Sequence, residues 1–238
     1  MTTLARKLSM LAGLVFALAL PAGAHGVVLH DQADSLGANS YVSEDFQPSF
    51  DSVDSQVADD FTVPFGETWT LDHMDVIGVD DGPPPPFANI FIYATAGTLP
   101  GSQLFHQAHI SATNYPNYSA PIAGAPSLEP GTYWISMQED GGGYMVPSWA
   151  WRGRLVQDGN QAAFEGSTGW GNGCTTFTPI QTCFPASDGM DMAWKISGRA
   201  DSQHVTFGKL KHLADGTATL TVNLPGNGIV VLLSLIHI

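Results

Sequence analysis

The chain has 238 residues, of which 44% are hydrophobic and 13% are charged, and it contains 26 glycines and 16 prolines. This composition supplies a buried core and many turns but too few charged residues for long surface helices. It therefore excludes a disordered chain and favours an all-β fold. The formal net charge of −14 repels phosphate groups, so we expect no nucleic acid among the partners and little attraction to anionic membranes.

The first 24 residues have the pattern of a secretory signal peptide. Arg6 and Lys7 form a basic start, residues 8–20 are an apolar run, and residues 21–24 supply a small-residue cleavage site. An N-terminal membrane anchor is the alternative, but the apolar run is short for that role. No later segment approaches the roughly 18–20 apolar residues that a membrane helix requires. We therefore expect an exported protein, extracellular or on the cell surface, with no transmembrane segment in the mature chain.

Residues 51–200 repeat short β-branched and aromatic runs separated by turn clusters, whereas residues 25–50 are polar and we expect them to be irregular. The absence of a helical period and the number of short runs predict an antiparallel two-sheet sandwich of jelly-roll type. The main strands are expected over residues 56–63, 68–77, 89–93, 103–110, 132–137, 149–151 and 190–196.

A second, smaller β-module is expected in residues 201–232. Residues 216–222 alternate between polar and apolar side chains, residues 224–228 form a turn, and a return strand begins at Ile229. This pattern predicts the opening hairpin of a truncated module. The last six residues, 233–238, resemble the translation of a sequencing adapter, so we interpret them as an artefact rather than as a native apolar tail.

Several strings in the body of the chain form a familiar set. They are VADDFTV at residues 57–63, GTYWIS at residues 131–136 and DMAWKISG at residues 191–198, with shorter matches between them. Together they resemble jelly-roll-like domains of secreted or cell-surface bacterial proteins, many of which carry C-terminal sorting tails. The resemblance implies a fold and a location, but it implies no activity, because one fold hosts many functions.

Cys174 and Cys183 are the only cysteines, nine positions apart. In an exported chain this pair predicts one disulfide that closes a loop. A redox or metal-binding thiol pair is the alternative, but the spacing is not Cys-x-x-Cys and no histidine lies nearby.

Aspartates gather around the first long strand of the expected sandwich. Asp51, Asp54, Asp59 and Asp60 lie at its entrance, and Asp191 begins the last strand. The first and last strands of sandwiches are often neighbours, so these carboxylates could converge on a hard cation. Calcium takes six to eight oxygen ligands and tolerates irregular geometry. The sequence thus offers a calcium site, with ordinary solvated loop acids as the alternative.

Four aromatic residues lie in or beside glycine-rich segments, namely Tyr144, Trp149, Trp151 and Trp170. Sugar-binding sandwiches present flat aromatic faces to pyranose rings and use nearby carboxylates and amides for the hydroxyl groups. The sequence therefore offers these four residues as a ligand-binding set, with core packing as the alternative.

Catalytic motifs are missing from the sequence. It contains no Gly-x-Ser-x-Gly elbow and no His-Glu-x-x-His zinc motif. His106 and His109 are three apart, which places them on opposite faces of a strand. Carboxylate pairs are plentiful, so a glycosidase dyad stays open as an alternative.

From these observations we expect an extracellular, non-catalytic β-sandwich with a structural or adhesive role. Its partners would be polysaccharide or other cell-surface components. A carbohydrate-binding module, with or without calcium, is the alternative function, and a secreted hydrolase is a further one.

Overall fold

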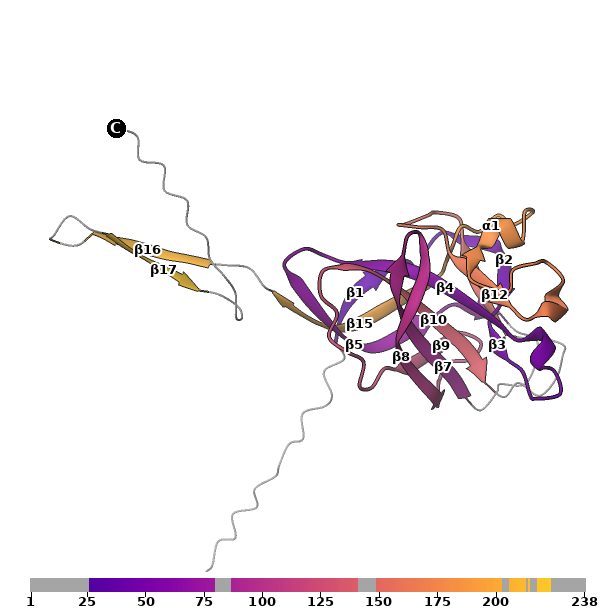
Figure 1. Cartoon of the computed structure of the whole chain (residues 1–238). Coiled ribbons are helices and arrows are strands. Elements are labelled where there is room, and N and C mark those ends of the chain that lie inside the picture. The colour runs from indigo at the N-terminus through magenta and orange to yellow at the C-terminus, as the bar shows by residue number, and fades with distance from the viewer. Residues whose placement is uncertain are drawn as a thin grey trace, which may run out of the picture.

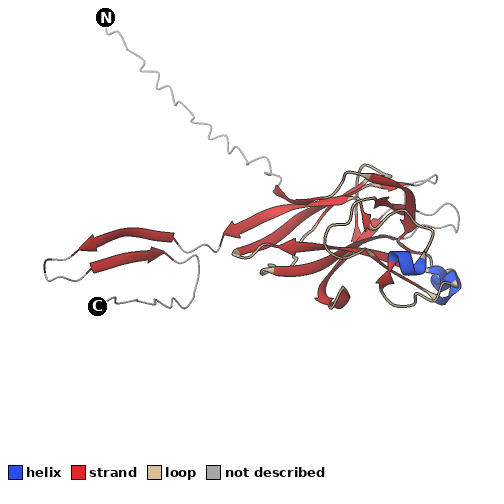
Figure 2. Cartoon of the chain, turned by 90° about the horizontal axis from the view of Figure 1, so that it is seen from above, coloured by secondary structure: helices blue, strands red, loops and turns tan. Residues whose placement is uncertain are grey.

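The computed structural model describes residues 26–79, 87–140, 149–202, 206–212, 214 and 218–223. These residues form a protein built almost entirely of β-strands (Figure 1). Within the described residues, the helical pieces are two 3₁₀ turns and one short α-helix, coloured blue in Figure 2. The helical pieces are η1 (Asp51–Val53), η2 (Thr168–Trp170) and α1 (Ile180–Cys183). None of the helices in these described ranges has the length and apolar character of a membrane span.

One layer of the sandwich is a four-stranded antiparallel sheet with the order β1-β15-β5-β9. Its strands are β1 (Val27–Asp31), β15 (Trp194–Ser202), β5 (Glu67–Val76) and β9 (Tyr118–Pro121). The long pairing of β15 with β5, from Trp194 opposite Val76 to Ser202 opposite Glu67, brings the last strand of the domain beside an early one.

The second layer is a seven-stranded sheet with the order β13-β12-β4-β3-β10-β7-β8, in which β4 also pairs directly with β10. Only the short β3–β10 pairing is parallel, and the others are antiparallel. Its strands are β13 (Thr178–Pro179), β12 (Ala163–Gly166), β4 (Ser55–Val63), β3 (Glu44–Asp45), β10 (Gly131–Asp140), β7 (Phe87–Ala96) and β8 (Leu99–Ile110).

A smaller sheet with the order β14-β11-β2 completes the domain, and β6 also pairs with β11. The strands are β14 (Asp191–Met192), β11 (Ala150–Arg154), β2 (Leu36–Val42) and β6 (Gly78–Val79). β11 has partners on both edges, and all of its residues except Arg152 are buried.

The core lies between the two large layers, and aromatic contacts join them. Phe61 on β4 stacks on Trp69 on β5 with ring centroids 6.1 Å apart, and its other side meets the edge of Trp194 on β15 at 6.0 Å. All three rings are buried. Residues Val57, Phe61 and Val63 share the core face of β4, as the two-residue period of a strand requires. The predicted all-β sandwich is confirmed.

The prediction that residues 25–50 are irregular is wrong. β1, β2 and β3 all lie in this segment, so the sandwich begins at Val27 rather than at residue 51. β1 is an edge strand whose only partner within the described residues is β15. Three of its five residues are apolar, but Val27 and Val28 are both exposed, so the strand lacks the alternating pattern that identified the central strands.

The predicted C-terminal hairpin is present with a different pairing. β17 (Ala218–Asn223) overlaps the expected strand over residues 216–222, but it pairs with the preceding segment β16 (Thr206–His212). The expected return strand beginning at Ile229 and the final six residues lie outside the described residues, as does the segment read as a signal peptide.

Candidate ligand-binding site

The structure does not support Trp149 and Trp151 as ligand-binding residues. Both indoles have no exposed surface. The Trp149 indole N–H donates to the Pro116 carbonyl oxygen at 2.9 Å, and the Trp151 indole N–H donates to the Ala193 carbonyl oxygen at 3.1 Å. The indoles are therefore core residues. The ligand-binding prediction for these two residues is wrong.

The structure places only one of the two other aromatic residues predicted to bind ligand, Tyr144 and Trp170. Tyr144 lies outside the described residues. Trp170 is half-buried, packs edge-to-face on Phe164 with centroids 5.5 Å apart, and donates its indole N–H to the Val53 carbonyl oxygen at 2.8 Å. Its exposed part lines a concave pocket of about 480 Å³. Trp170 is thus a fixed aromatic ring with an accessible surface.

The five aspartates offered as a calcium site do not converge on one point. Asp51 and Asp54 lie in η1 and at its C-terminal end, just before β4 begins. Asp59 and Asp60 are successive residues of β4, so their side chains leave opposite faces of the strand. The Asp59 carboxylate accepts hydrogen bonds inside the fold, whereas the Asp60 carboxylate is bound by the backbone and side-chain N–H groups of Asn160, each at 2.9 Å.

Asp59, Asp60 and Asp191 do lie within electrostatic reach of one another, since Asp191 raises the pKa of Asp59 and Asp60 raises the pKa of Asp191. The Asp59 carboxylate oxygens already accept from Trp194 Nε1 at 3.0 Å, from the Met192 N–H at 2.8 Å and from Gln32. In the part of the chain that the structure describes, no group of three or more His, Cys, Asp or Glu side chains is placed to hold a metal ion. The acidic residues therefore do not form the predicted calcium cage.

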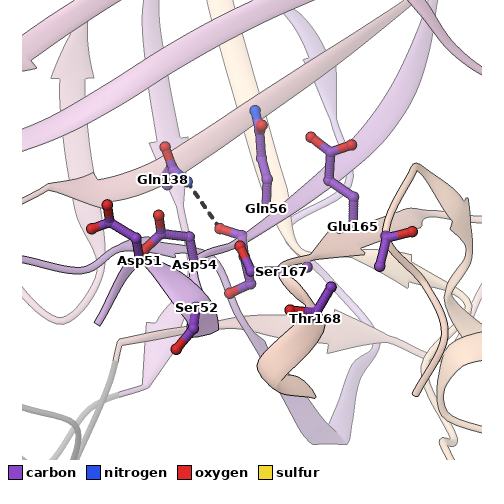
Figure 3. Close-up of a pocket in the computed structure, with 11 residues that line it drawn as sticks. Asp51, Ser52, Asp54, Gln56, Gln138, Glu165, Ser167 and Thr168 are labelled. Carbon is purple, nitrogen blue, oxygen red and sulfur yellow. Dashed lines mark hydrogen bonds between the residues drawn. The ribbon is translucent and has the colours of Figure 1, made fainter. Parts of the chain in front are cut away.

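A groove of about 590 Å³ with polar side chains along its lining lies at the start of β4 (Figure 3). We call it the polar groove. Its walls come from η1, from the ends of β4, β10 and β12, and from η2 and the loop after it. Almost every lining side chain carries a carboxyl, amide or hydroxyl group. The lining residues are Asp51, Ser52, Asp54, Ser55, Gln56, Gln138, Glu165, Gly166, Ser167, Thr168 and Thr175.

Two glutamines form the floor of the polar groove, and internal hydrogen bonds hold both. Gln56 donates to the Tyr93 hydroxyl at 2.7 Å and to the Ser136 hydroxyl at 3.0 Å, and Gln138 donates to the Ser55 carbonyl oxygen at 3.0 Å. These bonds use both amide N–H groups of Gln56 and one of Gln138, so the two side chains are fixed in position and their amide oxygens are left as acceptors.

Carboxyl groups flank the two glutamines at the base of the groove. Glu165 on β12 lies directly across from Gln56 on β4, and Figure 3 shows Asp54 on the other side of Gln56. Burial raises the pKa of Asp54 to about 6, and burial likewise raises the pKa of Glu165. A second groove of about 450 Å³ shares Asp51 and Asp54 with the first. The polar groove is therefore strongly acidic, and part of its charge is titrated near pH 6.

Sequence reasoning missed most of the polar groove. Gln56, Gln138 and Glu165 are outward-facing residues on strands whose inward neighbours are apolar. Glu165 lies on β12, a four-residue strand that no pattern indicated. The structure shows that Gln56 and Gln138 are nearly buried, where an uncharged polar side chain needs fixed hydrogen-bond partners. In the sequence, the corresponding signal was the presence of two glutamines within expected strands or at their ends.

The predicted disulfide between Cys174 and Cys183 is confirmed. The loop that it closes contributes Thr175 to the polar groove, and Cys183 lines the pocket beside Trp170. The disulfide thus anchors a loop that contributes to both concave surfaces.

Comparison with known proteins yields no relative: the chain matches no family model, no curated protein and no solved structure.

Proposed function

We propose that the protein is an extracellular, non-catalytic adhesive module that binds carbohydrate in the polar groove. The main support for this proposal is the lining of the groove, which combines carboxylates, amide oxygens and hydroxyl groups. The two glutamines at its base are held in place by hydrogen bonds. Each sugar hydroxyl both donates and accepts a hydrogen bond, so a surface rich in acceptors with hydroxyls at the rim is chemically matched to it.

The charge of the groove lining limits which class of glycan can bind. Among the described residues that line the groove, none is Lys or Arg, whereas Asp51, Asp54 and Glu165 are acidic. Sulfated and uronic-acid polysaccharides would be repelled by these carboxylates. The ligand class that fits the groove is therefore neutral glycan.

The extracellular location has two supports. The N-terminal sequence has the pattern of a secretory signal, and a disulfide of the Cys174–Cys183 kind forms and persists in oxidising compartments. Fractionation of cells that express the full chain tests this part of the proposal. Recovery of the protein in the cytoplasm with free thiols would contradict it.

The binding proposal is tested by screening the protein against an array of neutral and acidic glycans, followed by calorimetry on the neutral hits. Glu165→Gln keeps the shape of the side chain and removes its charge. Since hydrogen bonds to charged groups contribute about 1.5–3 kcal/mol, we expect this variant to bind at least about tenfold more weakly. Asp72→Asn, which removes an exposed carboxylate from β5 in the other layer, is the matched control and should bind as the wild type does. Failure to bind any neutral glycan, or equal binding by Glu165→Gln, would refute the proposal.

A hydrolase is the second candidate, favoured by one observation. Asp54 and Glu165 line the same groove and both have a raised pKa, and a carboxyl with a raised pKa can act as a general acid. Incubating the protein with the neutral glycans and measuring new reducing ends separates the two functions. A binding module releases none. Release that is abolished in both Asp54→Asn and Glu165→Gln would establish the hydrolase instead.

A further inference from the structure

A second concave surface lies beside Trp170 and differs in chemistry from the polar groove. This aromatic pocket has a volume of about 480 Å³. Three of its lining residues are aromatic, namely Tyr41, Trp170 and Phe184, and its rim carries the amide of Asn39 and the hydroxyl groups of Ser40 and Ser187.

The rings of the aromatic pocket are held in place from behind. Phe184 packs edge-to-face on Phe164 at 4.9 Å and against Tyr41 at 5.6 Å, while Trp170 packs on the same Phe164. Trp170 and Phe184 both keep part of their surface exposed. A pocket whose rings are already fixed loses little conformational entropy when a ligand enters.

The aromatic pocket and the polar groove both border η2, which packs against η1, and we call these two elements the η2 ridge. Thr168 lines the polar groove, and Trp170, two residues later, lines the aromatic pocket. The ridge is tightly packed, because a Cβ atom added to Gly169 would lie 2.3 Å from the Ser52 carbonyl oxygen. The hydroxyl of Ser55 in the groove also donates to the carbonyl oxygen of Val42, which lines the pocket, at 2.9 Å.

We propose that the aromatic pocket is a second subsite of the glycan-binding surface and that the ligand is an oligosaccharide that crosses the η2 ridge. This inference rests on the proposed function. A pyranose ring has an apolar face of C–H groups, which suits the negative face of an aromatic ring, and hydroxyl groups at its edge, which suit the polar rim. The polar groove would bind one unit through its hydroxyl groups, and the aromatic pocket would bind another through its apolar face.

The two subsites together predict a dependence on ligand length. A single sugar occupies one subsite, whereas a longer chain occupies both, and the second contact then forms without a further loss of overall motion. We therefore expect affinity to rise at least about tenfold between a monosaccharide and the shortest oligosaccharide that spans the ridge.

The test uses the full protein and linear series of cello-, xylo- and manno-oligosaccharides of one to six units, with affinity measured by calorimetry. Ala186→Arg places a long side chain at an exposed position on the aromatic pocket without removing any ring. Ala200→Arg, at an exposed position on β15 in the other layer, is the matched control. We expect Ala186→Arg to weaken the binding of the longer oligosaccharides about threefold to tenfold and the control to leave it unchanged.

A spectroscopic readout locates the second contact independently. All six tryptophans lie in the described residues, and five of them are buried, so Trp170 is the one whose emission a ligand reaches directly. Long oligosaccharides should change the tryptophan fluorescence of the wild type, and Trp170→Phe should abolish that change.

The outcomes separate the two proposals. Binding that Glu165→Gln weakens, but that is independent of ligand length and of Ala186→Arg, would overturn the second subsite and leave the polar groove standing. Loss of length dependence in Ala186→Arg together with the Trp170 signal supports the second subsite. Binding of no member of the three series would overturn both proposals.

Discussion

Asp59 and Asp191 lie within one another's electrostatic reach and differ in their hydrogen-bond partners. Four N–H groups donate to Asp59, from Gln32, Asp60, Met192 and Trp194. Asp191 accepts from the Asp158 N–H, but its Oδ1 is buried without a hydrogen-bond partner among the described residues. Burial raises the pKa of both carboxyls, but N–H donors stabilise the ionised form, so we assign the negative charge of the pair to Asp59 and the proton to Asp191.

This assignment predicts how stability depends on pH. Burial raises the pKa of Asp191 to about 7 from its ordinary value of 3.8. Between these two values the folded state holds a proton that the unfolded state has released, so the free energy of unfolding falls as pH rises from about 4 to about 7. Asp191→Asn mimics the protonated carboxyl. We expect it to reduce this fall and to raise the free energy of unfolding at pH 8 by about 1–3 kcal/mol.

Thermal unfolding from pH 4 to pH 9 checks this prediction. Asp72→Asn, at an exposed position, controls for the loss of one negative charge. A variant Asp191→Asn that is less stable than the wild type at pH 8 would show that the folded protein stabilises the ionised Asp191 carboxylate instead of penalising it by burial.

At the scale of the element, the loop between Cys174 and Cys183 connects the disulfide to the proposed function. The loop supplies Thr175 to the polar groove, and its Phe177 packs against Tyr93 on the outer face of β7 with centroids 5.4 Å apart. It is therefore held at its closed end by the disulfide and in its middle by an aromatic contact.

Replacing both cysteines with serine should lower the free energy of unfolding. In the loop-entropy model, a loop of this length contributes about 2–3 kcal/mol to the free energy of unfolding. We expect the free energy of unfolding to fall by that amount, with a correspondingly lower denaturant midpoint, and glycan binding to weaken because Thr175 loses its support. Wild-type stability in the double serine variant, measured by guanidinium unfolding under oxidising conditions, would contradict the prediction.

Most strands that pattern analysis predicted lie inside the sheets. The runs at residues 56–63, 68–77 and 132–137 correspond to β4, β5 and β10, and the run at residues 103–110 corresponds to the edge strand β8. Of the strands it missed, β2 lies at the edge of its sheet and β12 has only four residues. A central strand buries side chains on its core face and so leaves a pattern in the sequence, whereas an edge strand is stabilised largely by backbone hydrogen bonds that any residue except proline can donate.

At the scale of the whole molecule, the sandwich and the C-terminal hairpin differ in how they are stabilised. Within the described residues, β16 and β17 pair only with each other, and Phe207, Leu210 and Leu220 are exposed. An isolated two-stranded hairpin is marginally stable in water. The sandwich has its own core and does not draw on this hairpin.

Truncation after Ser202 tests this separation. We expect the shortened protein to keep the melting temperature of the full chain to within about 2 °C, because a change of 1 kcal/mol in a domain of this size shifts it by about 2–4 °C. Differential scanning calorimetry of both proteins makes the comparison. A drop well beyond that range would mean that the hairpin packs on the sandwich and belongs to its core.

What the sequence determined by itself is the class of fold, the central strands and the disulfide, because each follows from local composition, from a two-residue period or from a single pair of cysteines. The tertiary structure decided which polar and aromatic residues meet. It buried Trp149 and Trp151 and separated Asp51 from Asp59. It also brought Glu165 beside Gln56, more than a hundred residues apart in the chain. The alternation of polar and apolar residues along a strand indicates that the strand has two different faces. Only the packing of the layers determines which face is covered and which is accessible to a ligand.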